Sequence, residues 1–369
     1  MGFFSEYTQV NKLLQQRLQV VVYAESRHYY QYFEKIIDDL LAQEGVSICY
    51  ITSDKNDPLL QKAPAGMNTV YVKWMLGFLF SKIRAEVMLL TMPDLGNYLF
   101  KRSAGVGAYI YIFHAAVSTH QQYRKQAFFN YDTIFCTGDY QAQELRKAEA
   151  LYELPPKELV QYGYPLIDKI NQQQTHSNNL RPSVLIAPSW FSGCIFETCL
   201  EEMLQVLSSL PYDIVLRSHP EYEKREKKRF KQIQKLVGQY ASITIDHLPN
   251  IIDRLSVTDI LITDRSGIAL EFAFGREKPV LFIETALKQT NADWPELNIE
   301  PIENKLRSVV GITVAPGSMD ELPEKIKQLL SANTSFAQQM KELGATLFYN
   351  SPGAYNKGVE YILRKLNKD

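Results

Sequence analysis

A turn in the last third of the chain carries residues suited to binding a phosphate group. Ile260 to Thr263 is an apolar run that predicts a short buried strand, and Asp264-Arg265-Ser266-Gly267 follows it, ahead of apolar residues at helical spacing. The first N–H groups of a helix lack internal partners and lie at the positive end of its dipole, so they bind anions such as a pyrophosphate. We expect Ser266 to cap this helix or to donate its hydroxyl to a phosphate oxygen, and Gly267 to let a ligand approach the backbone. Glu271, more than one turn further on, could reach a ribose hydroxyl.

A second polar turn lies upstream of the first. Ile214 to Leu216 predicts another strand, and Arg217-Ser218-His219-Pro220 follows it. The carboxyl ends of strands in a parallel sheet face the ligand crevice, so both turns are expected to open toward one cleft. Either turn alone also fits a structural role, because capped helices follow strands throughout α/β proteins.

A histidine ends a predicted strand in the first half of the chain. Ala108 to Phe113 is apolar, and His114 follows it at the start of the segment His114 to His120. Histidine has the side-chain pKa closest to neutrality, so His114 is a candidate to take a proton from an acceptor hydroxyl. A lone histidine equally fits a structural residue held by hydrogen bonds.

Two sheets are needed to position these turns. The chain has 369 residues, 46% of them apolar and 22% charged, which is a globular composition long enough for two domains. Strand-like runs alternate with helical stretches in both halves, and this predicts an α/β protein with two doubly wound, Rossmann-like domains facing a central cleft. A polar stretch at 171–182 is the expected linker between domains 1–170 and 183–345. Residues 346–369 are expected to form a C-terminal helix that could pack back on the first domain.

Several helices are expected at particular places. The sequence predicts a short helix rich in Tyr and Phe after Pro93-Asp94 and another from Phe196 to Leu207. Two last helices are expected near Met319 to Leu330 and Ala354 to Leu366.

Composition excludes some classes of function. The net charge of −1 argues against a nucleic-acid binder that works by bulk attraction to phosphate. The four cysteines, Cys49, Cys136, Cys194 and Cys199, have no metal-site spacing and are expected to be buried thiols in a reducing compartment. No apolar run suits a secretory signal or a spanning helix, so we expect a soluble or peripheral protein.

Three stretches are candidates for contact with a membrane surface. A predicted N-terminal helix gathers apolar residues on one face, between Phe3 and Leu18, and 73–82 is rich in aromatic residues with lysines at its ends. Both patterns also suit helices that pack on the protein. The basic run at 223–235 is typical of a solvated helix face, and it could also attract anionic lipid.

The order of these motifs resembles one family. Two alternating halves joined by a linker resemble the GT-B glycosyltransferase-like fold. Phe113-His114, Gly163-Tyr164-Pro165, Ala187-Pro188-Ser189-Trp190, Arg217-Ser218-His219-Pro220 and Thr263-Asp264-Arg265-Ser266-Gly267 occur in this order along the chain. This series resembles the CDP-glycerol glycerophosphotransferases, which build teichoic acids and related phosphate-containing cell-surface polymers.

The resemblance implies a role for each motif. His114 would be the base that activates the acceptor, and Arg217 and His219 would hold the pyrophosphate of the donor. Ser266 and the amide of Gly267 would form the phosphate-binding turn, and Glu271 would meet the ribose; the turn at Ser189 belongs to the same donor site. The positive groups would come from the protein, so no metal or other cofactor is expected. A nucleotide-activated donor and a polymer or lipid-linked acceptor are the expected partners, at the inner face of the cell membrane.

The chain departs from the family pattern in two places. Arg265-Ser266-Gly267 stands where the family usually has Tyr-Ser-Ser, and Ala115 replaces the glycine that normally follows the base histidine. Two other functions stay open. Ser266-Gly267-Ile268 with Glu271 also resembles the non-hydrolysing UDP-N-acetylglucosamine 2-epimerases, although the acids that family needs in its first domain are scarce here apart from Asp94. A non-catalytic subunit that binds a nucleotide or polymer is the third possibility.

Overall fold

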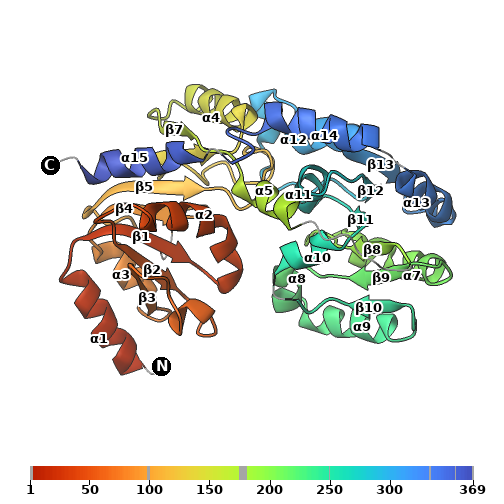
Figure 1. The fold of residues 1–369 in the computed structure, drawn as a ribbon, viewed down its shortest axis with the longest axis horizontal. Helices are drawn as coiled ribbons and strands as arrows, with labels where there is room; N and C mark the ends of the chain where they lie inside the picture. The colour runs from red at the N-terminus through yellow and green to blue at the C-terminus, as the bar shows by residue number, and fades with distance from the viewer. Residues whose placement is uncertain are drawn as a thin grey trace.

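Successive halves of the chain form two separate parallel β-sheets (Figure 1). The computed structural model describes residues 3–97, 100–173, 181–248, 250–331, 334–353 and 355–367. Within these residues the first sheet has seven strands in the order β3-β2-β1-β4-β5-β6-β7, and the second has six in the order β10-β9-β8-β11-β12-β13. All paired strands run parallel. Both strand orders reverse direction along the sheet, as in doubly wound domains that bind ligands at the carboxyl ends of their strands.

The strands of both sheets are short. Those of the first sheet are β1 (Leu18–Ala24), β2 (Ile48–Thr52), β3 (Met67–Tyr71), β4 (Ala85–Leu90), β5 (Val106–Ile112), β6 (Thr133–Cys136) and β7 (Glu158–Gln161). Those of the second are β8 (Ser183–Ile186), β9 (Asp213–Leu216), β10 (Ile243–Ile245), β11 (Ile260–Thr263), β12 (Val280–Ile283) and β13 (Gly311–Val314).

Helices cover both sheets. In the first half they are α1 (Phe3–Leu14), α2 (Tyr30–Leu41), α3 (Leu76–Lys82), α4 (Asp139–Leu151) and α5 (Pro165–Gln172). In the second half they are α6 (Ile195–Thr198), α7 (Leu200–Ser208), α8 (Pro220–Arg225), α9 (Lys227–Val237), α10 (Ile251–Ser256), α11 (Ile268–Gly275), α12 (Ile302–Val310), α13 (Leu322–Leu330), α14 (Thr334–Leu347) and α15 (Asn356–Leu366). Single 3-10 turns are η1 (Arg27–Tyr29), η2 (Pro58–Leu60), η3 (Trp294–Leu297) and η4 (Met319–Glu321).

The central strands are largely apolar because both faces of each sheet are buried there. In β1, Val21 and Tyr23 pack into the core on one face of the first sheet, and Val20 and Val22 pack into the core on the other. Successive strand residues point to opposite faces, so a strand covered on both sides becomes a continuous apolar run rather than an alternating one.

The two halves touch through α5 and α11. Ile167 and Ile170 of α5 share one buried cluster with Leu270 and Phe274 of α11. The two helices approach so closely that a Cβ added to Gly275 would lie 2.8 Å from the Cβ of Ile170. The junction is therefore fixed by packed side chains as well as by the connecting segment, of which residues 174–180 lie outside the described part.

The C-terminal helix returns to the first sheet (Figure 1). Val359, Tyr361 and Ile362 of α15 belong to the apolar core on one face of that sheet. The Tyr361 hydroxyl lies 2.6 Å from the hydroxyl of Thr133 in β6. The last segment therefore crosses from the second half and packs against the first.

Four expectations about helices were wrong. The described residues that follow Asp94 form turns, because Asp94 and Gly96 both have left-handed backbones, with φ of 64° and 89°. The helix expected at 196–207 is divided at Cys199 into α6 and α7, and α14 precedes the last helix where no helix was expected. Leu18 belongs to β1 and not to the N-terminal helix.

Candidate active site

His114 lies just past the end of β5 and is held by one hydrogen bond. Its Nδ1 is 3.2 Å from the carbonyl oxygen of Thr91, just past the end of the neighbouring strand β4. A carbonyl oxygen only accepts hydrogen bonds, so Nδ1 must carry the proton. The lone pair of the neutral ring is therefore at Nε2, where it can accept a proton from a substrate.

Three tyrosines surround the His114 ring. The centroids of Tyr29, Tyr32 and Tyr123 lie 5.8, 6.1 and 6.0 Å from that of His114, and all three rings meet it edge-on. Burial among these rings disfavours the charged imidazolium and lowers the pKa of His114 to about 4. His114 is therefore neutral at pH 7.

His219 is held in the opposite way at the start of α8. Its Nδ1 accepts a hydrogen bond from the backbone N–H of Glu221 at 3.2 Å, which makes His219 the N-cap of that helix. Burial lowers the pKa of His219 to about 3, so its neutral ring carries the proton on Nε2. The ring lies beside Trp190, with centroids 6.0 Å apart, and its Nε2–H is available as a donor.

The two histidines lie close enough to affect each other. The positive charge of Lys288 lowers the pKa of both, and His114 further lowers the pKa of His219. The turn after β1 also faces α8, since the charge of Glu221 raises the pKa of Glu25. In Figure 1, α8 lies on the side of the second half that faces the first. Strand-end residues of both halves are thus close enough to affect one another's pKa values.

Sequence reasoning missed Lys288. It lies in the segment after β12, which hydrogen bonds hold at both ends. At one end Arg265 donates to the carbonyl of Thr285 at 3.3 Å, and at the other the N–H of Thr290 donates to the carbonyl of Gln121 at 3.2 Å. Its half-buried ammonium forms no hydrogen bond or ion pair with any residue that the structure describes, and burial lowers its pKa. Lys288 lies five residues past the end of β12, too far from the strand for the strand-end pattern that singled out His114 to mark it.

Asp264 is buried beneath the turn at Arg265 to Gly267. Its carboxylate accepts hydrogen bonds from the N–H and the hydroxyl of Ser189, at 2.8 and 2.6 Å, and from the N–H of Ile195 at 3.0 Å. Asp264 is fully buried and Ser189 is 2% exposed. Both residues therefore fix the turn after β8 against the turn after β11, and neither presents its side chain to solvent.

Of the two roles expected for Ser266, the structure excludes the cap of α11. The N-cap position falls on Gly267, whose backbone is right-handed helical, and no side chain caps the helix. The half-buried Ser266 hydroxyl makes no hydrogen bond within the described chain, so it is available to a ligand. A Cβ added to Gly267 would lie 3.0 Å from Cγ1 of Val117 and 3.4 Å from Cβ of Ala115, so this turn meets the loop that follows His114.

The two predicted arginines are each held by a carboxylate. Arg217 donates to the buried carboxylate of Asp246, which also binds Arg254 at 3.0 Å. Arg265 donates to Glu284 at the end of β12. Both guanidinium groups lie near the strand ends, as expected, but neither is an unpaired cation.

Glu271 lies at the junction of the halves. It is 6% exposed, and its carboxylate accepts a hydrogen bond from the hydroxyl of Tyr164 at 2.7 Å. Burial raises the pKa of Glu271 to about 7, although the Tyr164 hydrogen bond opposes the shift. The predicted ribose contact is thus replaced here by a contact with the end of the first half.

The loop after His114 is clamped by the second half. The N–H and hydroxyl of Ser118 donate to the carboxylate of Glu303, at 3.0 and 2.9 Å, and Nε2 of His120 lies 3.0 Å from the carbonyl of Ile299. These bonds join α12 and the segment before it to the first half.

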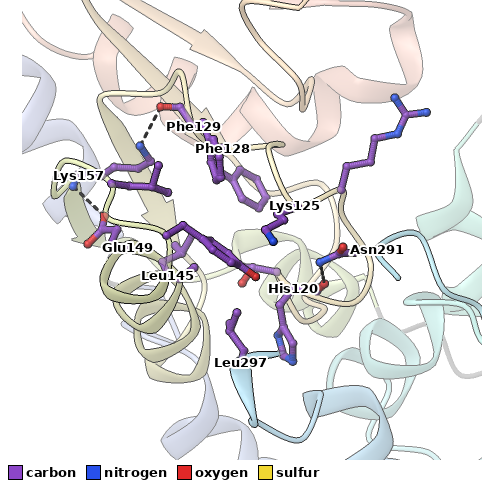
Figure 2. A pocket seen from close by; sticks show the side chains of 14 residues that line it. His120, Lys125, Phe128, Phe129, Leu145, Glu149, Lys157, Asn291 and Leu297 are labelled. Carbon is purple, nitrogen blue, oxygen red and sulfur yellow. Dashed lines mark hydrogen bonds between the residues drawn. The ribbon is translucent and has the colours of Figure 1, made fainter. Parts of the chain in front are cut away.

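A separate pocket lies behind this loop (Figure 2). Aromatic and aliphatic side chains such as Phe128 and Leu297 line it, together with His120, Lys125 and Lys157. The lysines are engaged: Lys125 binds Glu296 at 3.0 Å, and Lys157 donates to the carbonyl of Phe129 at 3.0 Å. None of the predicted site residues lines this pocket. In the part of the chain that the structure describes, no three His, Cys, Asp or Glu side chains are grouped as metal ligands.

Comparison with known proteins identifies the family. The profile of the CDP-glycerol:poly(glycerophosphate) glycerophosphotransferases matches residues 112–300, just over half of the chain. The chain belongs to this family. It is a glycerophosphotransferase-like transferase, as the motif series predicted. No curated protein matches the chain.

Solved structures share the fold at low identity. A wall teichoic acid polymerase TagF structure soaked with CDPG aligns with a TM-score of 0.60 and 13% identity, over 94% of this chain and 88% of that one. A UDP complex of MnaA from S. aureus has a TM-score of 0.57 and 12% identity, over 95% and 97% of the chains. A UDP-N-acetylglucosamine 2-epimerase has a TM-score of 0.55 and 12% identity, over 95% of each. The predicted GT-B-like architecture is confirmed; at these identities the likeness shows the fold alone.

Proposed function

We propose that this transferase moves glycerol phosphate, or a related polyol phosphate, from a CDP-activated donor to a hydroxyl of a cell-surface polymer or its lipid-linked precursor. One observation carries the proposal. Two neutral histidines, one from each half, lie close enough for His114 to affect the pKa of His219; the lone pair of His114 is at Nε2, and His219 carries its proton there. The first suits a base and the second a hydrogen-bond donor to phosphate.

The reaction follows from this pairing. Nε2 of His114 takes the proton of the acceptor hydroxyl, and the acceptor oxygen forms a bond to the phosphorus that carries the glycerol. The bond from that phosphorus to the bridging oxygen breaks, and CMP leaves with the electron pair. Phosphoryl transfer depends on positioning and charge neutralisation more than on covalent help, so a neutral base held near the phosphorus is sufficient.

The second half would hold the donor. The Nε2–H of His219 and the Ser266 hydroxyl donate to diphosphate oxygens, and the amide of Gly267 adds a donor at the start of α11. The Lys288 ammonium neutralises the charge that develops on the leaving phosphate. Four side chains act indirectly, by fixing the turns that would hold the donor: Arg217, Arg265, Asp264 and Ser189. Glu271 contacts the end of the first half through its hydrogen bond with Tyr164.

These cations and dipoles supply the positive charge, so the proposed reaction needs no metal. Transfer rates measured in EDTA and in added Mg²⁺ should agree within about twofold. A rate that depends on Mg²⁺ would contradict this part of the proposal.

The proposed acceptor places the enzyme at the inner face of the cell membrane. Polymers of this kind grow on lipid-linked precursors, and the enzyme must reach them from the side that holds nucleotide-activated donors. None of the helices that the structure describes combines the length and apolar character needed to cross a bilayer.

A transfer assay tests the function. Wild-type protein with CDP-glycerol and a synthetic lipid-linked glycerophosphate primer should release CMP and elongate the primer, and His114→Ala should do neither. Unchanged turnover in His114→Ala would remove the base from the mechanism. A thermal-shift assay distinguishes the transferase from the epimerase alternative. CDP-glycerol at a hundredfold excess over its Kd should stabilise the protein by about 2.7 kcal/mol, whereas UDP-N-acetylglucosamine should not stabilise it.

A further inference from the structure

Hydrogen bonds hold the loop after His114 at each residue from 117 to 121. Thr119 donates through its N–H and its hydroxyl to Oε2 of Glu144 in α4, at 2.6 and 2.7 Å. Asn291, from the second half, donates to the carbonyl of His120 at 2.9 Å (Figure 2). The remaining bonds join Val117 to Gln141, Ser118 to Glu303, and Gln121 to Thr290. The loop that begins at the proposed base is therefore fixed to both halves at once.

Each ring nitrogen of His120 faces an oxygen that only accepts hydrogen bonds. Nε2 lies 3.0 Å from the carbonyl oxygen of Ile299 in the second half, and Nδ1 lies 3.4 Å from Oε1 of Glu144 in the first. His120 is 5% exposed and Glu144 is 1% exposed, so this contact has little access to bulk water. A neutral imidazole carries one proton and can serve one of these oxygens, whereas an imidazolium serves both.

The proton between His120 and Glu144 belongs to the ring. Oε2 of Glu144 already accepts two hydrogen bonds from Thr119, and such bonds stabilise the ionised form of a carboxylate. Burial alone would lower the pKa of His120. The carboxylates of Glu144 and Glu303 and the carbonyl of Ile299 outweigh burial, and they raise that pKa above the ordinary value of 6.5.

The other charged side chains near the ring line the pocket beside it (Figure 2). They are Arg124, Lys125, Glu149 and Lys157. Lys125 is ion-paired with Glu296 at 3.0 Å, Glu149 is ion-paired with Arg146, and the Arg124 side chain is 70% exposed. Lys157 lies across the pocket from the ring (Figure 2). The carboxylates that face the ring, from α4 and α12, therefore decide its charge.

α12 connects His120 to the proposed donor site. Ile299, the second-half partner of the ring, lies just before this helix. Arg307, within the helix, donates to the carbonyl of Asp264 at 2.8 Å, and Asp264 immediately precedes the turn that contains Ser266. His120 thus joins the loop of the base to the element that also holds the turn of the donor site.

We propose that His120 is a positioning residue for the transfer reaction: its imidazolium binds the loop after His114 to α4 and to the segment before α12, and so sets the distance from the base to the donor. Its role in the reaction rests on the proposed function. A neutral ring keeps one of the two contacts, so the loop gains freedom relative to the donor turn. A misplacement of about 1 Å can lower a rate by about 100-fold, so a small movement is sufficient.

The protonation state of the ring is tested first, without donor or acceptor. Long-range ¹H–¹⁵N spectra of histidine-labelled protein should show two protonated ring nitrogens for His120, and His120→Gln identifies these signals by removing them. One proton should be lost only as the pH rises through the raised pKa, so the midpoint should lie above pH 6.5, the value for a free histidine. A midpoint at or below pH 6.5 would overturn the proposal.

Transfer assays at pH 6.5 test the effect on the reaction. In His120→Gln the amide, like a neutral ring, offers a donor to one oxygen and a lone pair to the other. We expect kcat to fall by about tenfold or more, with the donor Kd within about twofold of wild type. His120→Lys keeps a positive charge and should recover kcat to within about threefold of wild type. The exposed His247 provides the control, and His247→Gln should match wild type.

Hydrogen exchange separates the loop from the chemistry. Amides of residues 115–121 should exchange faster in His120→Gln than in wild type and slow again in His120→Lys, with no substrate present. If wild type transfers nothing, the proposed function fails, and this measurement with the ring titration still decides whether His120 holds the loop. Wild-type kcat in His120→Gln, no recovery in His120→Lys, or an equal loss of donor affinity would each overturn the positioning role. Should His120→Gln not fold, the titration of wild type and the activity of His120→Lys decide the question.

Discussion

His114 and His219 each follow the carboxyl end of a parallel strand, one in each half, yet their hydrogen bonds prepare them for different roles. Nδ1 of His114 donates to the carbonyl of Thr91, whereas Nδ1 of His219 accepts from the N–H of Glu221. Burial keeps both rings neutral at pH 7. One partner atom therefore decides that the first ring offers a lone pair and the second a proton.

Because the two rings differ in this way, the proposed mechanism gives each half of the molecule a different task in the reaction. In the proposed mechanism, the half that ends at α5 supplies the base, and the half that begins at β8 supplies the hydrogen-bond donor to phosphate. Removing Nε2 of His114 should therefore affect catalysis, and removing Nε2 of His219 should affect donor binding.

The largest effect is expected from His114→Asn. The Asn side chain can keep the hydrogen bond to Thr91, but it has no basic nitrogen at the position of Nε2. We expect kcat to fall by about 10²- to 10⁴-fold, the usual contribution of a general base, with the donor Kd within about twofold of wild type. Stopped-flow transfer rates and calorimetric donor titration measure the two quantities. A raised Kd with unchanged kcat would assign His114 to binding instead.

His219→Asn should produce the complementary result. Asn can still accept the N–H of Glu221 and cap α8, but the proton at Nε2 is lost. A hydrogen bond to a charged group contributes about 1.5–3 kcal/mol, so the donor Kd should rise by about 10- to 100-fold. Calorimetry should show His219→Asn and Ser266→Ala as larger losses of donor affinity than His114→Asn. Equal losses in all three would end the distinction between the two histidines.

The sequence predicted the turns because strand ends are a local signal. Buried parallel strands become apolar runs, so the polar residues that end them stand out, and this located His114, His219 and the turn at Ser266. It could not show that Arg217 would pair with Asp246, because that carboxylate comes from beyond the next strand and meets the arginine only after folding. Lys288 was missed for the opposite reason: it stands alone after β12 with no motif around it.

Packing between the halves was equally hidden from the sequence. Gly267 and Ala115, two of the three positions at which the chain departs from the family pattern, face each other at the junction. α14 was missed because its buried Met340 packs on the second half through a narrow apolar stripe in an otherwise polar segment. Such contacts depend on which elements meet, and the sequence gives no direct sign of that.

A smaller effect on donor affinity is expected from Lys288, which has no ion-pair partner among the described residues, than from the histidines, and a still smaller one from Arg265, which is ion-paired. Lys288→Met removes an ammonium that has no ion-pair partner among the described residues, and we expect donor affinity to fall by about tenfold, or about 1.4 kcal/mol. Arg265→Met is the control, since its guanidinium is already bound to Glu284. It should change donor affinity by less than about threefold. A larger loss in Arg265→Met would show that the arginine exchanges Glu284 for the donor.

The smallest effect is expected from mild acid. The neutral ring of His114 is the active form, so activity is lost as the pH falls through its pKa, which burial has lowered to about 4. Lowering the pH from 7.5 to 5.5 should therefore change kcat/KM by less than about twofold, whereas a histidine with an ordinary pKa of about 6.5 would lose about tenfold over this range. Protonation of His219, with a pKa of about 3, falls still lower and would add a positive charge that favours the donor. Samples returned to pH 7.5 control for unfolding. Glu271, with a pKa of about 7, titrates in the same range, so the profile is also measured in Glu271→Gln. An inflection near pH 6.5 that persists in Glu271→Gln would show that the ring of His114 is solvated in the working enzyme, and burial among Tyr29, Tyr32 and Tyr123 would then not be what keeps the base neutral.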